Sequence, residues 1–115
     1  MRDAARHPVR EIRWVDRTAV VDAEGDIDLS SSRDFQQVLL MLQDRNPARI
    51  VINLTAVPYM DSSGMASLVK LLSRTRRHGM PLRLFGLSDR VRSLFEITRL
   101  DGVFSICATE EEALA

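Results

Sequence analysis

The stretch Pro58-Tyr59-Met60-Asp61-Ser62-Ser63-Gly64-Met65 lies between two segments of different periodicity. It follows the largely apolar run Ile50–Leu54 and precedes a helical pattern that starts at its last residue. A short apolar run rich in β-branched residues is typical of a buried parallel strand. Asp61 then stands where a helix N-cap is expected, because its carboxylate can accept the free N–H groups of the first turn. The stretch therefore predicts a strand, a tight loop and an exposed helix start in succession.

The predicted helix start is a place where an anion is tolerated. Ser62 and Ser63 put two hydroxyls beside unpaired N–H groups and the positive end of a helix dipole. A phosphate could arrive there with a ligand or be attached to a serine. A plain helix cap explains the same residues, since Asp and Ser are common at that position.

The composition indicates one soluble globular domain. The chain has 115 residues, of which 45% are hydrophobic and 28% charged, enough for a real core. A formal net charge of zero gives no basic footprint for nucleic acid, and no apolar run approaches the roughly 20 residues that span a membrane. The single cysteine, Cys107, predicts a buried thiol in a reducing compartment, which a bacterial cytoplasm fits.

The N-terminal half predicts a tail, two strands and a helix. Residues 1–8 are polar and are expected to be a flexible tail, with residues 9–115 forming a single domain. Val9–Trp14 and Thr18–Glu24 predict two strands joined by a short turn. Trp14 lies on the apolar face of the first strand, where core or edge packing is expected, and a surface aromatic that binds a partner is the alternative. The next segment has helical apolar spacing, led by Ser31 with Asp34 three residues on as a variant capping box. Its apolar positions are Phe35, Val38, Leu39 and Leu42.

The C-terminal half alternates strands with helices. Leu82–Leu87 and Phe104–Ala108 predict strands, and Ser88 and Thr109 are expected to cap the helices that follow them. The helix after Asp61 is expected to end at Gly79. Its predicted inward face is Met65, Leu68, Val69 and Leu72. Two strands, a helix and then strand–helix alternation predict an α/β domain with a mostly parallel sheet and right-handed crossovers.

The serines do not predict a hydrolase. A serine nucleophile needs a base within hydrogen-bond reach, and the only histidines are His7 and His78. His7 falls in the expected tail, and His78 is sixteen residues after Ser62 on the same predicted helix, about 24 Å away at 1.5 Å per residue. The chain has no nucleophile elbow, Walker lysine, dinucleotide fingerprint or Cys/His metal spacing. We therefore expect no catalytic activity, no cofactor and no metal.

Three stretches together resemble a known family. Residues 54–64, taken with Gly25-Asp26-Ile27-Asp28 and with residues 87–102, are similar to the STAS domain and, more narrowly, to the bacterial anti-sigma factor antagonists. The resemblance covers residues 9–108, and its most specific part is Met60–Ala66. The chain departs from the family at Met65-Ala66, where Leu-Gly is commoner. The resemblance implies the STAS fold, with a mostly parallel central sheet, an antiparallel first strand and helices packed on the sheet.

The resemblance also implies the roles of single residues. The family's phosphoacceptor is the serine directly after the motif aspartate, which is Ser62 here. Ser63 is the neighbouring serine with a structural role, and Asp28 matches an aspartate at a strand end on the same rim. The residues expected to form the partner-binding surface are Asp28, Asp61, Ser62, Ser63, Gly64 and Met65.

The family works by partner switching. Its partner is a serine kinase that doubles as an anti-sigma factor and supplies the ATP. The unphosphorylated antagonist binds this kinase and releases the sigma factor, the phosphorylated form cannot bind, and a separate serine phosphatase restores it. For this chain we expect a cytoplasmic protein that is a monomer when free and binds neither nucleic acid nor a membrane.

A second reading stays open. STAS domains also serve as constitutive scaffolds, as subunits of lipid-transport systems and in stressosome-type assemblies. The intact Asp61-Ser62-Ser63-Gly64 favours the phosphorylation switch over such an assembly role.

Overall fold

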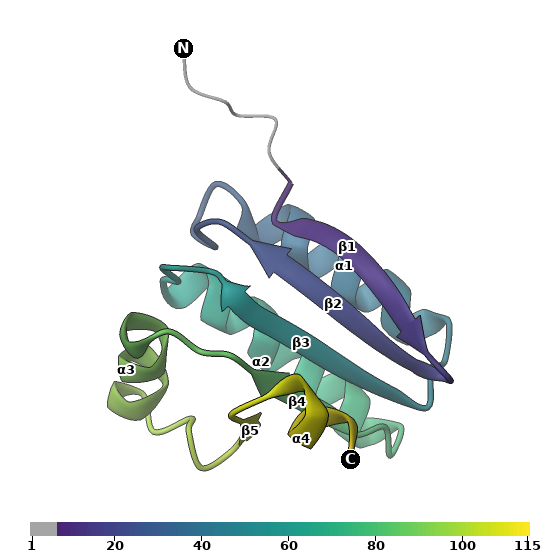
Figure 1. Cartoon of the computed structure of the whole chain (residues 1–115). Helices are drawn as coiled ribbons and strands as arrows, with labels where there is room; N and C mark the ends of the chain where they lie inside the picture. Colours follow the sequence, from purple (N-terminus) through teal and green to yellow (C-terminus); the bar gives the residue numbers. More distant parts are fainter. Residues whose placement is uncertain (1–6) are drawn as a thin grey trace.

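The computed structural model describes residues 7–115, which form a five-stranded sheet with four helices (Figure 1). The strands are β1 (Val9–Val15), β2 (Thr18–Glu24), β3 (Arg49–Ala56), β4 (Leu82–Phe85) and β5 (Ser105–Cys107). The helices are α1 (Ser32–Asp44), α2 (Ser62–Arg77), α3 (Asp89–Ile97) and α4 (Glu110–Leu114). The sheet order is β1-β2-β3-β4-β5, with β1 antiparallel to β2 and all later pairs parallel. The predicted α/β class and the antiparallel first strand are confirmed.

The sheet is covered on both faces, as expected for parallel strands. Helices α1 and α2 lie behind the sheet and α4 lies in front of it (Figure 1). Successive side chains of a strand point to opposite faces. Ile50 and Ile52 of β3 therefore join the large core with α1, α2 and α3, whereas Val51 joins a small cluster with Ala113 of α4.

Three predicted helix caps are present. The Asp61 carboxylate accepts from the N–H groups of Ser63 and Gly64 at the start of α2. The hydroxyl of Ser88 accepts from the N–H of Val91 in α3, and that of Thr109 accepts from Glu112 in α4. These caps fix where each helix begins, and the first of them fixes the candidate site.

The buried face of α2 differs from the predicted one. Val69 is exposed, whereas Leu71 and Thr75 are buried together with Met65 and Leu68. Apolar residues occur around much of this helix, so spacing alone does not decide which stripe faces the sheet. The observed stripe is centred one position away from the predicted one.

The capping box predicted for α1 is not formed. Ser31 is the N-cap residue but makes no side-chain capping bond. Its hydroxyl instead donates to the carbonyl of Asp26 at 2.9 Å and accepts the N–H of Asp28 at 3.0 Å. The serine therefore organises the β2–α1 loop and not the helix start.

Smaller differences concern the tail, β4 and Cys107. Pro8, expected in the tail, is buried, and its carbonyl accepts the N–H of Glu24 at 2.8 Å; the rest of the predicted tail, residues 1–6, lies outside the described residues. Strand β4 ends before Gly86, because Gly86 has a φ of +77°, which no strand residue adopts, and packs closely against Thr55. The Cys107 side chain is half-buried, not fully buried as predicted.

An ion-pair network centred on Arg13 fastens α4 to the sheet. The Arg13 guanidinium donates to Asp22 at 2.7 and 2.8 Å and to Glu110 of α4 at 2.6 and 3.1 Å. Asp22 is only 2% exposed and also accepts from the Asn53 amide at 2.9 Å. The hydrogen bonds from Arg13 are the main cause that holds the pKa of Asp22 below its ordinary value. Arg13 thus joins β1, β2 and the front helix.

We expect Arg13→Met to lower the free energy of unfolding by about 3 kcal/mol at pH 7, because it leaves a buried carboxylate without its cation. The folded-state pKa of Asp22 is depressed, so the stabilisation is present above the unfolded pKa of about 3.9 and is lost as the pH falls through the folded value. Urea unfolding at several pH values should therefore show the wild-type advantage shrinking under acid conditions.

Arg10→Met is the matched control. Arg10 is on the same strand, but its pair with Glu24 is long, at 3.9 Å, and its side chain is 54% exposed. Its loss should change the free energy of unfolding by about 0.5 kcal/mol or less. An equal effect of the two substitutions, or an Arg13→Met effect that does not depend on pH, would contradict this account.

A close contact between two loops sets the position of α2. A Cβ at Gly64 would lie 2.7 Å from the carbonyl oxygen of Ile27, 2.8 Å from its Cγ2 and 2.7 Å from Cγ of Met60. The helix start can approach the β2–α1 loop this closely only because residue 64 has no side chain.

Gly64→Ala should therefore lower the free energy of unfolding by about 1–3 kcal/mol through overpacking against a backbone atom, although alanine is the better helix former. Gly102→Ala is the control, since a Cβ there has no atom within 4 Å. Chemical denaturation of both variants measures the difference. A Gly64→Ala protein as stable as Gly102→Ala would show that the loops can separate without cost.

Candidate functional site

The candidate site lies where two loops meet at the carboxyl ends of β2 and β3. We call it the Ser62 rim and define it as residues 25–31 and 57–63. Sheet pairing continues beyond the strands here, with an isolated parallel bridge between Ile27 and Met60. The N–H of Ile27 donates to the carbonyl of Tyr59 at 3.0 Å, and the N–H of Asp61 donates to the carbonyl of Ile27 at 3.2 Å. The two loops are therefore held edge to edge.

The Asp61 carboxylate joins the two loops a second time. Its Oδ1 accepts from the N–H groups of Ser63 at 2.8 Å and Gly64 at 3.2 Å, which caps α2. Its Oδ2 accepts from the N–H of Leu29, across the rim, at 3.2 Å. The sequence predicted the cap but not the bond to Leu29, because nothing local to residue 61 indicates a partner thirty-two positions away.

Asp28 lies on the same rim as Asp61, where the sequence placed it. Its Oδ1 accepts from the Ser30 hydroxyl at 2.7 Å and from the Ser30 N–H at 3.0 Å. The hydrogen bond from the Ser30 hydroxyl is the main reason why the pKa of Asp28 lies below its ordinary value. The group is therefore anionic at neutral pH, and with Asp61 it makes the rim locally acidic.

Ser62 and Ser63 differ in their surroundings. Ser62 is the first residue of α2 and is exposed, and its hydroxyl makes no hydrogen bond with any described residue. Ser63 is half-buried, and although its hydroxyl likewise makes no hydrogen bond with a described residue, its N–H is bonded to Asp61 and its carbonyl accepts from the Ser67 hydroxyl at 3.2 Å. A group attached to Ser62 would therefore break no bond within the protein, and it would sit at the positive end of the α2 dipole.

Gly64 and Met65 lie below the surface. Met65 is only 5% exposed and belongs to the main core, and Gly64 is packed against Ile27. Gly64 has no side chain and that of Met65 is buried, so neither offers a side chain to a docked protein, and their part in the partner-binding surface stays a prediction. Their place in the motif is explained by packing.

Ser67 and Leu29 are rim features that the sequence analysis missed. The buried hydroxyl of Ser67 donates to the carbonyl of Ser32 at 3.2 Å and so joins α2 to the start of α1. Leu29 is 80% exposed in the middle of the rim. An apolar residue alone in the polar run Asp28-Leu29-Ser30-Ser31 is the signal that could have drawn attention to it. At the α3 side of the rim, the Arg90 guanidinium lies 5.1 Å from the ring centroid of Tyr59.

The rim holds no histidine that could activate Ser62. The ring Nδ1 of His78 lies near the carbonyl of Arg74 at 2.9 Å and near the amide of Gln43 at 3.4 Å, at the other end of α2. Among residues 7–115, no group of three or more His, Cys, Asp and Glu side chains is placed to hold a metal ion. None of the helices in this part of the chain combines the length and the apolar character that crossing a membrane requires.

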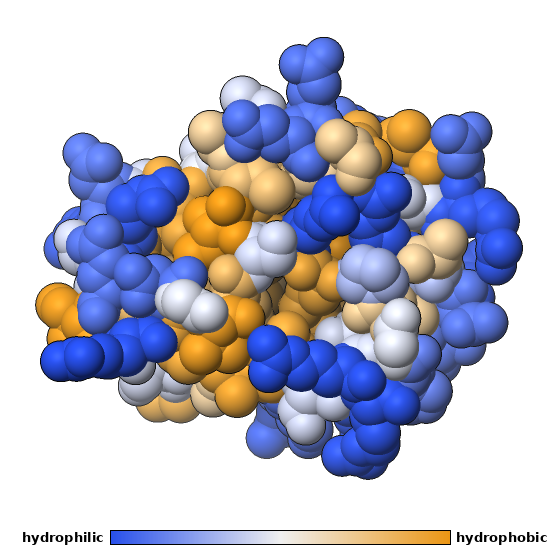
Figure 2. Space-filling model, turned by 90° about the horizontal axis from the view of Figure 1, so that it is seen from below, coloured by the Kyte–Doolittle hydropathy of each residue, from blue (hydrophilic) through white to orange (hydrophobic). Residues whose placement is uncertain are grey.

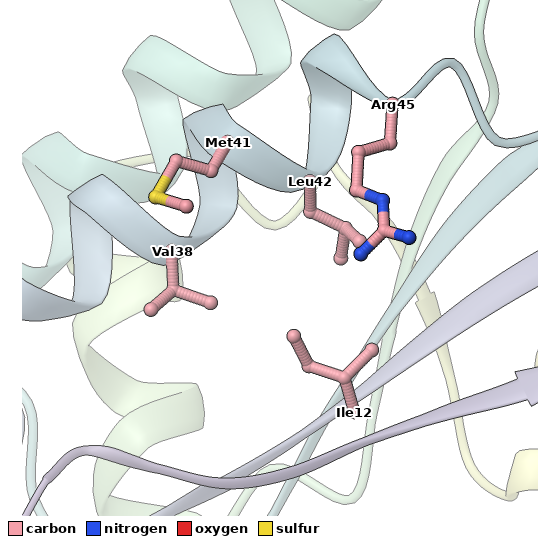
Figure 3. A pocket seen from close by; sticks show the side chains of 5 residues that line it. All are labelled: Ile12, Val38, Met41, Leu42 and Arg45. Carbon is pink, nitrogen blue, oxygen red and sulfur yellow. The ribbon is translucent and has the colours of Figure 1, made fainter.

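Two other surfaces are apolar. A groove of about 160 Å³ lies between β1 and α1 (Figure 3), lined by Ile12, Val38, Met41, Leu42 and Arg45. The guanidinium of Arg45 also lies 5.8 Å from the ring centroid of Trp14, which is 45% exposed and not packed in the core. Figure 2, which views the molecule from below, shows a second gathering of apolar side chains. Exposed apolar residues also include Ile97 at the end of α3 and Val103 in the turn that precedes β5.

Comparison with known proteins identifies the family to which this chain belongs. The model of the STAS domain matches residues 10–113. The chain is 38% identical over 88 residues to an anti-sigma-B factor antagonist of Listeria monocytogenes, covering 76% of this chain and 77% of that one. It is 31% identical over 91 residues to an anti-sigma-B factor antagonist of Staphylococcus aureus, covering 79% and 84%.

Solved structures agree on the fold. An anti-sigma factor antagonist from Mycobacterium paratuberculosis superposes with a TM-score of 0.84 at 23% identity, covering 90% of this chain and 88% of that one. The Bacillus cell fate determinant SpoIIAA in its phosphorylated form superposes with a TM-score of 0.71 at 23% identity, covering 90% and 95%. With the STAS model matched over nearly the whole chain and the curated relatives above 30% identity, this protein belongs to the STAS domain family of anti-sigma factor antagonists.

Proposed function

We propose that this protein is a phosphorylation-controlled partner switch that, when unphosphorylated, binds an anti-sigma factor with serine kinase activity. Ser62 is the phosphoacceptor, and a serine phosphatase reverses the modification. The observation that carries the proposal is the Ser62 hydroxyl itself, which is exposed and unbonded at the start of α2, beside the Asp28 and Asp61 carboxylates. Membership in the antagonist family supports the choice of partner. The protein acts in the cytoplasm, as a monomer when free, and by binding without catalytic turnover.

Phosphorylation should leave the fold intact. It adds about −1.5 to −2 charges and three acceptor oxygens, and a helix N-terminus tolerates such a charge. The bonds that hold the rim use the backbone N–H groups of Leu29, Ser63 and Gly64 and not the Ser62 hydroxyl. The added charge therefore removes no existing hydrogen bond.

Phosphorylation should nevertheless end partner binding. A kinase must bring the terminal phosphate of its nucleotide to the Ser62 hydroxyl, so the nucleotide phosphates face this point of the rim. A phosphate already on Ser62 would face them with the same sign of charge. Like charges opposed in an interface cost several kcal/mol, and each 1.4 kcal/mol weakens binding about tenfold.

Incubation with ATP and each anti-sigma factor serine kinase of the source organism tests the proposal. Ser62→Ala should abolish labelling and keep binding, because it removes a small hydroxyl and adds no charge. Ser62→Asp should weaken binding while shifting the melting temperature by only a few degrees, as for a surface change of about 0.5 kcal/mol. Phosphate incorporation and complex formation are followed together.

Ser63→Ala is the control and should still be labelled. Phosphate on Ser63 with Ser62 unmodified would refute the residue assignment. Undiminished binding of the fully phosphorylated protein to its kinase would refute the switch.

A further inference from the structure

We propose that Leu29 is the apolar anchor through which the Ser62 rim docks into its partner, and that the partner presents an apolar pocket bordered by cationic side chains. The inference rests on the proposed function and adds to it a contact residue and the chemistry of the facing surface. The proposal rests on the observation that the Leu29 side chain is 80% exposed, while its backbone N–H is bonded to the Asp61 carboxylate that caps α2.

Exposure alone does not single out this side chain, because isolated exposed apolar residues are common. Ile97 is also 80% exposed. Leu29 differs from Ile97 in its position relative to Ser62. Leu29 shares the Asp61 carboxylate with the first turn of α2, so it lies beside Ser62. Ile97 lies two turns further along α3 than Arg90, the residue that contacts the rim through Tyr59.

The loop that carries Leu29 is fixed before any partner arrives. The N–H of Asp28 donates to the Ser31 hydroxyl at 3.0 Å, that of Leu29 to Asp61 at 3.2 Å, and that of Ser30 to the Asp28 carboxylate at 3.0 Å. Three consecutive N–H groups are therefore held by side chains. A loop already in its binding conformation loses little conformational entropy on association. This loop therefore presents Leu29, its one exposed apolar side chain, with little loss of entropy.

Charge around Leu29 defines the partner. Residues 25–34 and 57–65 contain four carboxylates, those of Asp26, Asp28, Asp34 and Asp61, against one guanidinium, Arg33, and a second guanidinium, that of Arg90, lies over the Tyr59 ring at the α3 side of the rim. Interfaces typically bury an apolar centre within a polar border. A partner that accepts the Leu29 side chain in a pocket and places Lys or Arg side chains around it would complement both features.

Affinity measurements with the purified kinase that labels Ser62 test the anchor, with ADP in place of ATP so that no phosphate is transferred. Leu29→Ala should weaken binding at least tenfold. Leu29→Met should bind within about threefold of wild type, because the two side chains have similar volumes. Ile97→Ala, which truncates an equally exposed side chain, should leave the affinity unchanged. Melting temperatures of all variants should match that of the wild type.

The salt dependence of the affinity distinguishes the apolar anchor from the cationic border. Wild-type affinity should fall as salt rises from about 0.05 to 0.5 M, because the carboxylates and the cationic border are screened. The ratio of wild-type to Leu29→Ala affinity should stay constant, since burial of an apolar side chain is not screened.

The outcomes distinguish the anchor from the switch. Undiminished binding by Leu29→Ala, or an equal loss with Ile97→Ala, overturns the anchor while labelling and release at Ser62 leave the switch standing. Affinity that does not depend on salt overturns the cationic border. A wild-type chain that no such kinase binds or labels overturns the switch, and the anchor with it.

Discussion

The Asp61 carboxylate holds the two loops of the Ser62 rim together and caps helix α2. One oxygen accepts the first free N–H groups of α2, and the other accepts the N–H of Leu29 from the β2–α1 loop. A single side chain thus fixes the start of the helix, the direction of its dipole and the distance between two loops. Ser62, the proposed phosphoacceptor, is positioned by this carboxylate without a side-chain bond to it, so its hydroxyl remains available for chemistry.

The rest of the fold supports this arrangement by bringing the two loops close. Parallel pairing of β2 with β3 ends both strands at the same edge, and the Ile27–Met60 bridge extends the pairing into the loops. Gly64 then allows the backbone of α2 to approach Ile27 more closely than any side chain would permit. On the opposite face, Arg13 fastens α4 by an ion pair. Because the rim is held by these contacts, we expect a change of charge at Ser62 to alter the surface presented to a partner and not the shape of the domain.

Features set by neighbouring residues could be predicted from the sequence. The strands follow from β-branched runs, and the caps at Asp61, Ser88 and Thr109 follow from side-chain oxygens placed just before helical patterns. The site residues Ser62 and Asp28 were located through resemblance to a family. Their roles in phosphorylation and partner binding remain predictions, although the structure places both on one rim.

What could not be predicted depends on contacts between distant residues. The inward stripe of α2 includes Leu71 in place of Val69, because the sheet and α1 decide its rotation. The bonds of Asp61 to Leu29 and of Arg13 to Glu110 join segments that carry no local sign of each other. The burial of Met65, in contrast, agrees with its predicted place on the inward face of this helix.

Amide hydrogen exchange, measured by NMR before and after phosphorylation of Ser62, tests the central claim that the modification changes charge and not structure. The N–H groups of Leu29, Ser63 and Gly64 report directly on the Asp61 carboxylate. The account predicts that their slow exchange persists in the phosphorylated protein, because a bonded amide exchanges only when its local structure opens. Fast exchange at these three amides after phosphorylation would show that the rim opens, and would contradict the account.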